Sequence, residues 1–101
     1  MEIQKAKQES SIKTDPENEF SVMDGPIMQS ATDALMILSK FGTVCLKARG
    51  ELIPNAVSIA NIITENFLKD NSAIDKIDLD SEIHPNNGKL ISTIEIILSK
   101  N

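Results

Sequence analysis

Apolar residues recur at helical spacing over residues 27–41, with polar residues on the opposite side. This spacing predicts an amphipathic helix whose apolar stripe consists of Ile27, Ala31, Ala34, Leu35, Leu38 and Phe41. Asp24 or Gly25 is expected to cap the start of this helix, with Pro26 at its first position. Gly42 is expected to end it, since glycine readily adopts the left-handed conformation that terminates helices.

A second helix and several strands complete the pattern. The second helix is expected to open at Ile53-Pro54, with an apolar stripe of Ala56, Val57, Ala60, Ile63 and Phe67. Alternating apolar and polar residues predict strands from Phe20 to Met23, Thr43 to Arg49, Asp75 to His84 and Leu90 to Lys100. Pro85-Asn86-Asn87-Gly88 is a turn signal, so the last two strands should form a hairpin.

The predicted order of elements is β-α-β-α-β-β. Two strand–helix–strand crossovers imply right-handed connections and parallel pairing, and the hairpin adds an antiparallel pair. We therefore expect an α/β (α+β) fold, a two-layer sandwich with two helices on one face of a mixed four-stranded sheet. The last strand is largely apolar on both faces in its second half, so it should be central or covered by a partner chain.

Residues 1–18 differ from the rest of the chain in being almost wholly polar. They bury too little surface to offset the entropy of ordering, so we expect a flexible polar tail over 1–18 and one domain over 19–101. Lys5, Lys7 and Lys13 offer contacts to a polyanion, but a plain tail is the simpler interpretation.

Few residues suit catalysis or metal binding. Cys45 is the only cysteine and is expected to be a buried thiol, and His84 is the only histidine. A single cysteine excludes an intramolecular disulfide and makes a four-ligand zinc site implausible. Asp78, Asp80 and Glu82 alternate along one strand face as solvated acids do, and no glycine-rich phosphate loop occurs. We expect no enzyme activity, no catalytic residue, no metal and no cofactor.

Net charge and hydropathy exclude further classes of protein. The formal net charge is −5, whereas most nucleic-acid-binding domains are basic, so dense coating of DNA is not expected. No stretch approaches the ~20 apolar residues of a membrane span, and the N-terminus is unlike a secretory signal. These features predict a cytoplasmic protein that makes no contact with membranes.

Two segments carry a family resemblance. The first is Leu46-Lys47-Ala48-Arg49-Gly50, followed by Ile53, Ala56-Val57, Ile59-Ala60 and Asn66-Phe67-Leu68. The second is Ser92-Thr93-Ile94-Glu95-Ile96-Ile97-Leu98-Ser99-Lys100. Both segments, and the helix start Pro26-Ile27-Met28, resemble Alba-family proteins. The resemblance runs from about Phe20 to Lys100 and agrees with the predicted order of elements.

The resemblance implies a non-enzymatic dimer that binds DNA, RNA or both, as archaeal chromatin proteins of this family do on the nucleoid or chromosome. It implies contacts to the phosphate backbone with little base readout. The nucleic-acid-binding residues it implies are Lys47, Arg49, Gly50, Asn55, Asn87 and Lys89. His84 and Asn86 are further candidate donors, although the turn alone explains the asparagines. Phe67, with Asn66 and Leu68, matches an interface within or between dimers, and core packing explains Phe67 equally well.

The chain also departs from the family pattern. Asp24 and Gly25 stand where the family has a lysine pair that is acetylated, so no acetylation switch is expected here. Glu51 and Asn55 stand where arginines are common. A dimer would hold six candidate phosphate contacts, from Lys47, Arg49 and Lys89 twice, against a net charge of −10 by doubling. The slope of log affinity against log salt would then be at most about −5.

Two functions remain open on these grounds. The first is a nucleic-acid-binding Alba-like homodimer whose binding is weak or selective and salt-sensitive. The second is a structural partner that pairs with a more basic Alba paralogue or another protein and binds little nucleic acid itself. The acidic balance and Glu51 motivate the second.

Overall fold

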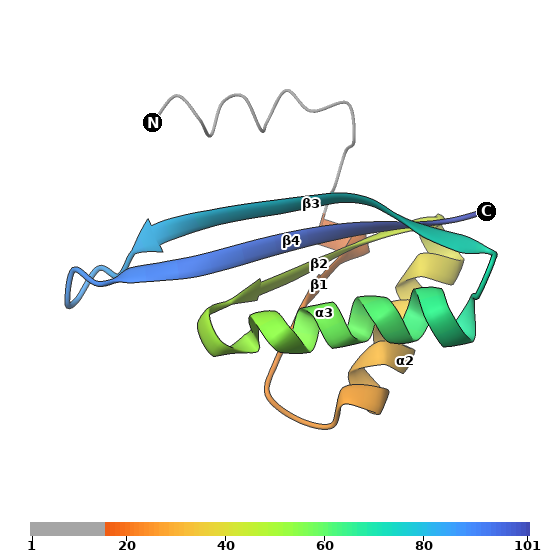
Figure 1. Cartoon of the computed structure of the whole chain (residues 1–101), viewed down its shortest axis with the longest axis horizontal. Coiled ribbons are helices and arrows are strands. Elements are labelled where there is room, and N and C mark those ends of the chain that lie inside the picture. The colour runs from red at the N-terminus through yellow and green to blue at the C-terminus, as the bar shows by residue number, and fades with distance from the viewer. Residues whose placement is uncertain (1–15) are drawn as a thin grey trace.

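The computed structural model describes residues 16–101, and its elements follow the predicted β-α-β-α-β-β order (Figure 1). They are β1 (Glu19–Ser21), α2 (Ile27–Phe41), β2 (Thr43–Arg49), α3 (Ile53–Ile62), β3 (Ser72–Ile83) and β4 (Leu90–Lys100). Short 3-10 turns precede β1 (η1, Pro16–Asn18) and α3 (η2, Gly50–Leu52), and a π-helical turn (η3, Ile63–Phe67) extends α3. Residues 1–15 of the expected tail lie outside the described residues.

The four strands form one mixed sheet in the order β1-β2-β4-β3. β1 pairs with β2 in parallel, and β4 is antiparallel to both β2 and β3. The predicted central position of the last strand is thus confirmed. Parallel pairing at the second crossover was wrong, because α3 joins β2 to β3 while β4 lies between them. A strand that is apolar on both faces gains most from this enclosed position.

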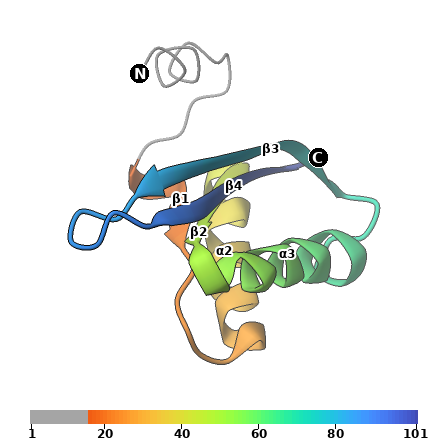
Figure 2. The same ribbon diagram turned by 60° about the vertical axis from the view of Figure 1, so that its left-hand side comes forward.

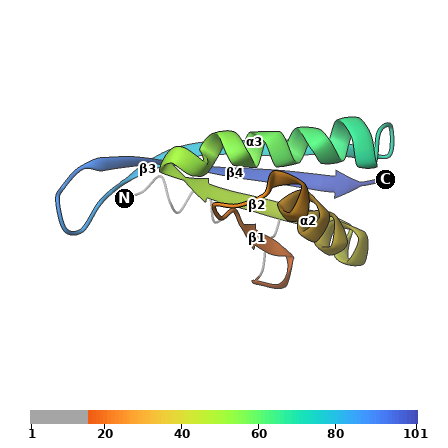
Figure 3. The same ribbon diagram turned by 90° about the horizontal axis from the view of Figure 1, so that it is seen from below.

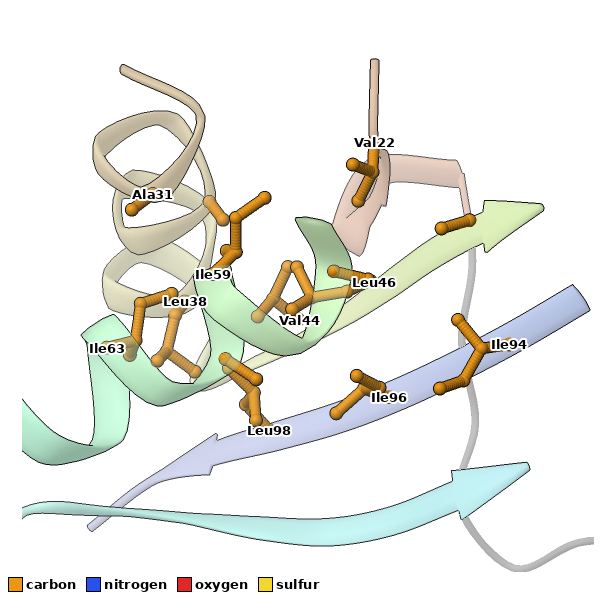
Figure 4. Packing of buried hydrophobic residues seen from close by; sticks show 14 residues of the cluster. Val22, Ala31, Leu38, Val44, Leu46, Ile59, Ile63, Ile94, Ile96 and Leu98 are labelled. Atoms are coloured by element: carbon orange, nitrogen blue, oxygen red, sulfur yellow. The ribbon is translucent and has the colours of Figure 1, made fainter. Parts of the chain in front are cut away.

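Both helices pack against the same face of the sheet, as predicted (Figures 2 and 3). In Figure 4, Leu38 of α2, Ile59 of α3 and Ile63 of η3 lie on the same side of the sheet as Val44 and Leu46 of β2. Ile96 and Leu98 of β4 complete this fully buried set. Each such side chain contributes roughly 1.5–3 kcal/mol relative to exposure in water, so this layer holds the helices to the sheet.

The start of α2 differs from the prediction, and its end agrees. Neither Asp24 nor Gly25 caps the helix, because Pro26 occupies the N-cap position with φ −65° and ψ 125° and no side-chain cap bond forms. Gly42 ends the helix with φ 81°, and its N–H donates to the carbonyl oxygen of Leu38 at 2.7 Å. Phe41, expected in the apolar stripe, is exposed at the helix end, with the Lys40 ammonium 5.3 Å from its ring centroid.

The buried stripe of α3 is shifted from the predicted one. It consists of Ala56, Ile59 and Ala60 of α3 and continues to Ile63 of η3. Val57 and Phe67, which were expected in it, are 42% and 36% exposed. The buried stripe faces β2 and β4, since α3 packs against those two strands. Val57 was placed in the stripe because apolar residues surround the helix on more than one side, so spacing alone did not identify the side that faces the sheet.

β3 carries apolar side chains that no helix of the described chain covers. Ile77 pairs in register with Ile96, and Leu79 pairs with Ile94, so their side chains share the helix-side face of the sheet. Their partners on β4 are buried beneath α3, whereas Ile77 and Leu79 are 53% and 72% exposed. We call Ile74, Ile77, Leu79 and Ile83 of β3 the apolar flank; all four are exposed.

Candidate nucleic-acid interface

The end of β2 presents two cations on the sheet face opposite the helices. Val44, Leu46 and Ala48 point into the core, and the alternation of the strand therefore turns Lys47 and Arg49 the other way. The strand stops at Gly50, whose φ of 60° is the left-handed conformation that favours glycine. The predicted strand and its end thus bring Lys47, Arg49 and Gly50 together at one edge of the sheet face.

Both cations are paired with carboxylates from neighbouring strands. The Lys47 ammonium lies 3.0 Å from a carboxylate oxygen of Glu19 on β1 and 3.8 Å from one of Glu95 on β4. The Arg49 guanidinium forms an ion pair with Glu82 on β3. All of these side chains are at least a quarter exposed, so each pair contributes no more than about 1 kcal/mol to stability.

The charges around Lys47 shift its titration. Partial burial of the ammonium lowers the pKa of Lys47, but the hydrogen bond to Glu19 and the charges of Glu95 and Glu19 outweigh this effect, so the pKa lies above its ordinary value. Lys47 therefore keeps its positive charge well above neutral pH. The carboxylates of Glu19 and Glu95 already pair with this charge.

A hollow of about 560 Å³ lies where the ends of β1 and β2 meet β4 and β3. Its lining contains Lys47 and Arg49 together with Asp80, Glu82 and Glu95. Three carboxylates thus face two cations, and the hollow is mixed in charge rather than positive. A phosphate group that binds here must compete with carboxylates for the same N–H donors.

The hairpin between β3 and β4 holds the third cation. It projects past the helices in Figure 1, which leaves its tip open to a ligand. Two side chains that were predicted as donors, His84 and Asn87, accept hydrogen bonds within the turn. The Asn86 N–H donates to His84 Nδ1 at 3.1 Å, and the Lys89 N–H donates to Asn87 Oδ1 at 2.9 Å. Within residues 16–101 no carboxylate forms an ion pair with Lys89, and its side chain is exposed.

The remaining sequence-predicted residues lie elsewhere. Asn55 is half-buried near the start of α3, in the helix layer, so the fold does not bring it to the face that carries Lys47 and Arg49. Asn66 and Phe67 are exposed at the end of the α3–η3 helix. Leu68, expected at an interface, packs partly buried against the core.

Sequence reasoning missed the carboxylates that face the two cations. Glu82 was interpreted as a solvated acid, and Glu19 and Glu95 were not singled out. Their contacts depend on the order and register of the strands, in which Lys47 pairs with Glu95 across β2 and β4. The alternation of Asp78, Asp80 and Glu82 on one face was the available signal, but it does not show which strand carries the facing cation.

A family model described as Alba matches residues 18–81. The chain belongs to the Alba family. Alba from Thermoplasma volcanium is similar in structure with a TM-score of 0.73 and 30% sequence identity, over 82% of this chain and 100% of that one. ALBA1 from Trypanosoma brucei shares the fold with a TM-score of 0.69 and 21% identity, over 86% of this chain and 72% of that one.

Proteins of the Alba family generally bind nucleic acids and have no enzymatic activity. In the described part of this Alba chain, no three His, Cys, Asp or Glu side chains are placed so that they could hold one metal ion. Within residues 16–101 no helix has the length and apolar character needed to cross a membrane. Lys47 and Arg49 on the open sheet face and Lys89 on the hairpin are the sequence-predicted cations that the arrangement presents.

Proposed function

We propose that this Alba protein binds DNA or RNA through backbone phosphates, weakly and with strong dependence on salt. The observation that carries the proposal is the position of Lys47 and Arg49 at the end of β2, on the sheet face that the helices leave open, in a chain that belongs to the Alba family. If the ligand is DNA, the proposal includes a location in the cytoplasm on the nucleoid or chromosome.

The charge distribution supports weak rather than dense binding. Lys47 and Arg49 must exchange carboxylate partners for phosphate, whereas Lys89 on the hairpin needs no such exchange with a described residue. The net charge of −5 opposes the approach of a polyanion at long range. With six such contacts in a dimer, the slope of log affinity against log salt is at most about −5, so binding weakens as salt rises.

A homodimer formed through the apolar flank is part of this proposal. The flank lies on β3, which is an edge strand, and exposed apolar side chains gathered in this way mark interaction sites. Val57 of α3 is exposed as well and adds to the apolar surface on the helix side. A second copy placed by a two-fold axis would bury both flanks and double the number of phosphate contacts.

Fluorescence anisotropy with labelled duplex DNA and with single-stranded and duplex RNA, begun at about 20 mM salt, tests the proposal. Binding in the micromolar range that weakens steeply with added salt is the expected result. The absence of binding to all three at tens of micromolar protein would overturn it. Light scattering on the same samples reports the mass of the assembly.

A structural role is the second candidate, and the ion pairs of Lys47 and Arg49 favour it. Cations already held by carboxylates offer little to a polyanion, so a more basic Alba paralogue would supply the contacts in a heterodimer. Mixing the chain with such a paralogue and measuring the mass by light scattering separates the two functions. Homodimers alone, with nucleic-acid binding of their own, would exclude this role.

A further inference from the structure

The carboxylate that faces Arg49 comes from a strand that is not its neighbour. In register, Arg49 of β2 lies opposite Thr93 of β4, and Thr93 lies opposite Asp80 of β3. Glu82 follows Asp80 by two positions, so it is on the same face of the sheet. The guanidinium therefore reaches Glu82 across the central strand, where Thr93 presents a short side chain.

The pair is exposed enough to exchange. The Arg49 and Glu82 side chains are 57% and 47% exposed, and both line the mixed hollow. A guanidinium has five N–H donors in a planar fork, and carboxylate and phosphate oxygens fit that fork in the same way. A phosphate at this position therefore meets a donor set that is already occupied by Glu82.

From this geometry we infer that Glu82 is an intramolecular competitor of phosphate, which occupies Arg49 and so sets the affinity and salt dependence of nucleic-acid binding. The inference rests on the proposed function and assigns its regulation to a carboxylate of the same chain. Glu19 and Glu95 hold Lys47 in the same manner, since they flank it from β1 and β4. The sheet face thus limits its own attraction for polyanions.

Replacement of Glu82 by Gln tests the inference, because it removes the charge and retains the shape of the side chain. At low salt, the affinity of E82Q for a fixed duplex is expected to be about three- to tenfold higher than that of the wild type. The slope of log affinity against log salt should steepen by about 0.9 for each Arg49 that is released, or about 1.8 for the homodimer. Glu82→Ala carries the same expectation, and circular dichroism shows whether each variant is folded.

Glu65→Gln is the matched control. Glu65 is exposed on η3, at the end of the helix layer, so the variant makes the same change in net charge away from the two cations. When the two variants are compared at about 0.1 M salt, where the Debye length is about 10 Å, the affinity of Glu65→Gln should change less than about twofold, since interactions between exposed charges beyond that distance are largely screened. A rise equal to that of E82Q would show that net charge alone is responsible and would overturn the inference.

A double-mutant cycle shows whether Glu82 acts through Arg49. In an R49Q background, the gain from E82Q should disappear, because the competed donor is absent. A gain that persists indicates general repulsion of phosphate and overturns the inference. If the wild type binds and E82Q binds equally or more weakly, the inference is overturned and the proposed function stands. If neither protein binds DNA or RNA, the proposed function and the inference are both overturned.

Discussion

The side-chain amide of Asn18 donates a hydrogen bond to the hydroxyl oxygen of Thr43 at 2.8 Å and lies almost completely buried, with 7% of its surface exposed. It ties η1 to the first residue of β2. Asn18 was expected in the tail, and in the structure it is buried and hydrogen-bonded to β2. We predict that Asn18→Ala lowers the free energy of unfolding by about 1–3 kcal/mol, measured by urea denaturation. A change below about 0.5 kcal/mol would contradict this.

Gly42 offers a test of backbone geometry alone. Its φ of 81° is disfavoured for residues with a side chain, while a Cβ added there would meet no atom within 4 Å. Gly42→Ala should therefore cost about 1–2 kcal/mol of stability through conformation and not through a clash. Thermal denaturation compares it with Ser39→Ala, an exposed position inside α2 where alanine should be neutral or slightly stabilising.

Cys45 predicts a loss of stability at high pH. Burial raises the pKa of the Cys45 thiol from 9.0 to about 12, and the charge of Glu95 adds to this effect. Between these values the unfolded chain loses a proton that the folded chain keeps, so the free energy of unfolding falls as pH rises. The decrease is roughly 1 kcal/mol per pH unit.

Urea denaturation of the wild type and of Cys45→Ala over this pH range checks that slope. The variant should lose the component due to the thiol, while the titration of lysines is common to both proteins. Parallel curves for the two proteins would show that the thiol does not contribute.

The apolar flank predicts self-association. Leu79→Asp places a charge in the centre of the flank and should shift the protein from dimer to monomer, because burial of an unpaired carboxylate is costly. Sedimentation or light scattering over a range of concentrations measures the shift. Met36→Asp, at a similarly exposed position on α2, is the control and should leave the mass unchanged. Equal masses for wild type and Leu79→Asp would argue against the flank as the interface.

The β2 cations predict the salt response of binding. The double variant K47Q/R49Q should weaken binding to duplex DNA about tenfold or more at low salt. It removes two contacts from each subunit, so it should flatten the salt slope of the homodimer by about 3.6. Anisotropy titrations at several salt concentrations measure both quantities. Lys69→Gln, an exposed lysine next to η3, should have a much smaller effect. An unchanged slope in K47Q/R49Q would place the phosphate contacts elsewhere.

The order of elements was predictable because local rules decide it. Gly42 ends α2 as expected, and the alternation from Thr43 to Arg49 matches β2 residue for residue. What failed was non-local. The neighbour of β3 depends on which strand is stabilised most by being buried between two others. The buried side of α3 depends on the direction in which the helix lies on the sheet. Neither Ile59 nor Val57 reveals that direction by its spacing.

The candidate site was predictable in part for the same reason. Alternation alone places Lys47 and Arg49 on the open face, and Gly50 ends the strand beside them. The contact between Arg49 and Glu82 required the register of three strands, which sequence spacing does not supply. The sequence therefore identifies the cations but not what already holds them.

The central position of β4 has a consequence for biosynthesis. β2 and β3 both pair with β4 and not with each other, so the sheet cannot close while Leu90–Lys100 is still inside the ribosome. Until then a nascent chain exposes two unpaired strand edges and the apolar residues that β4 will cover, which is the state most prone to aggregation. Folding of this domain should thus follow the emergence of β4 from the ribosome, and chaperones that shield nascent chains should increase its yield.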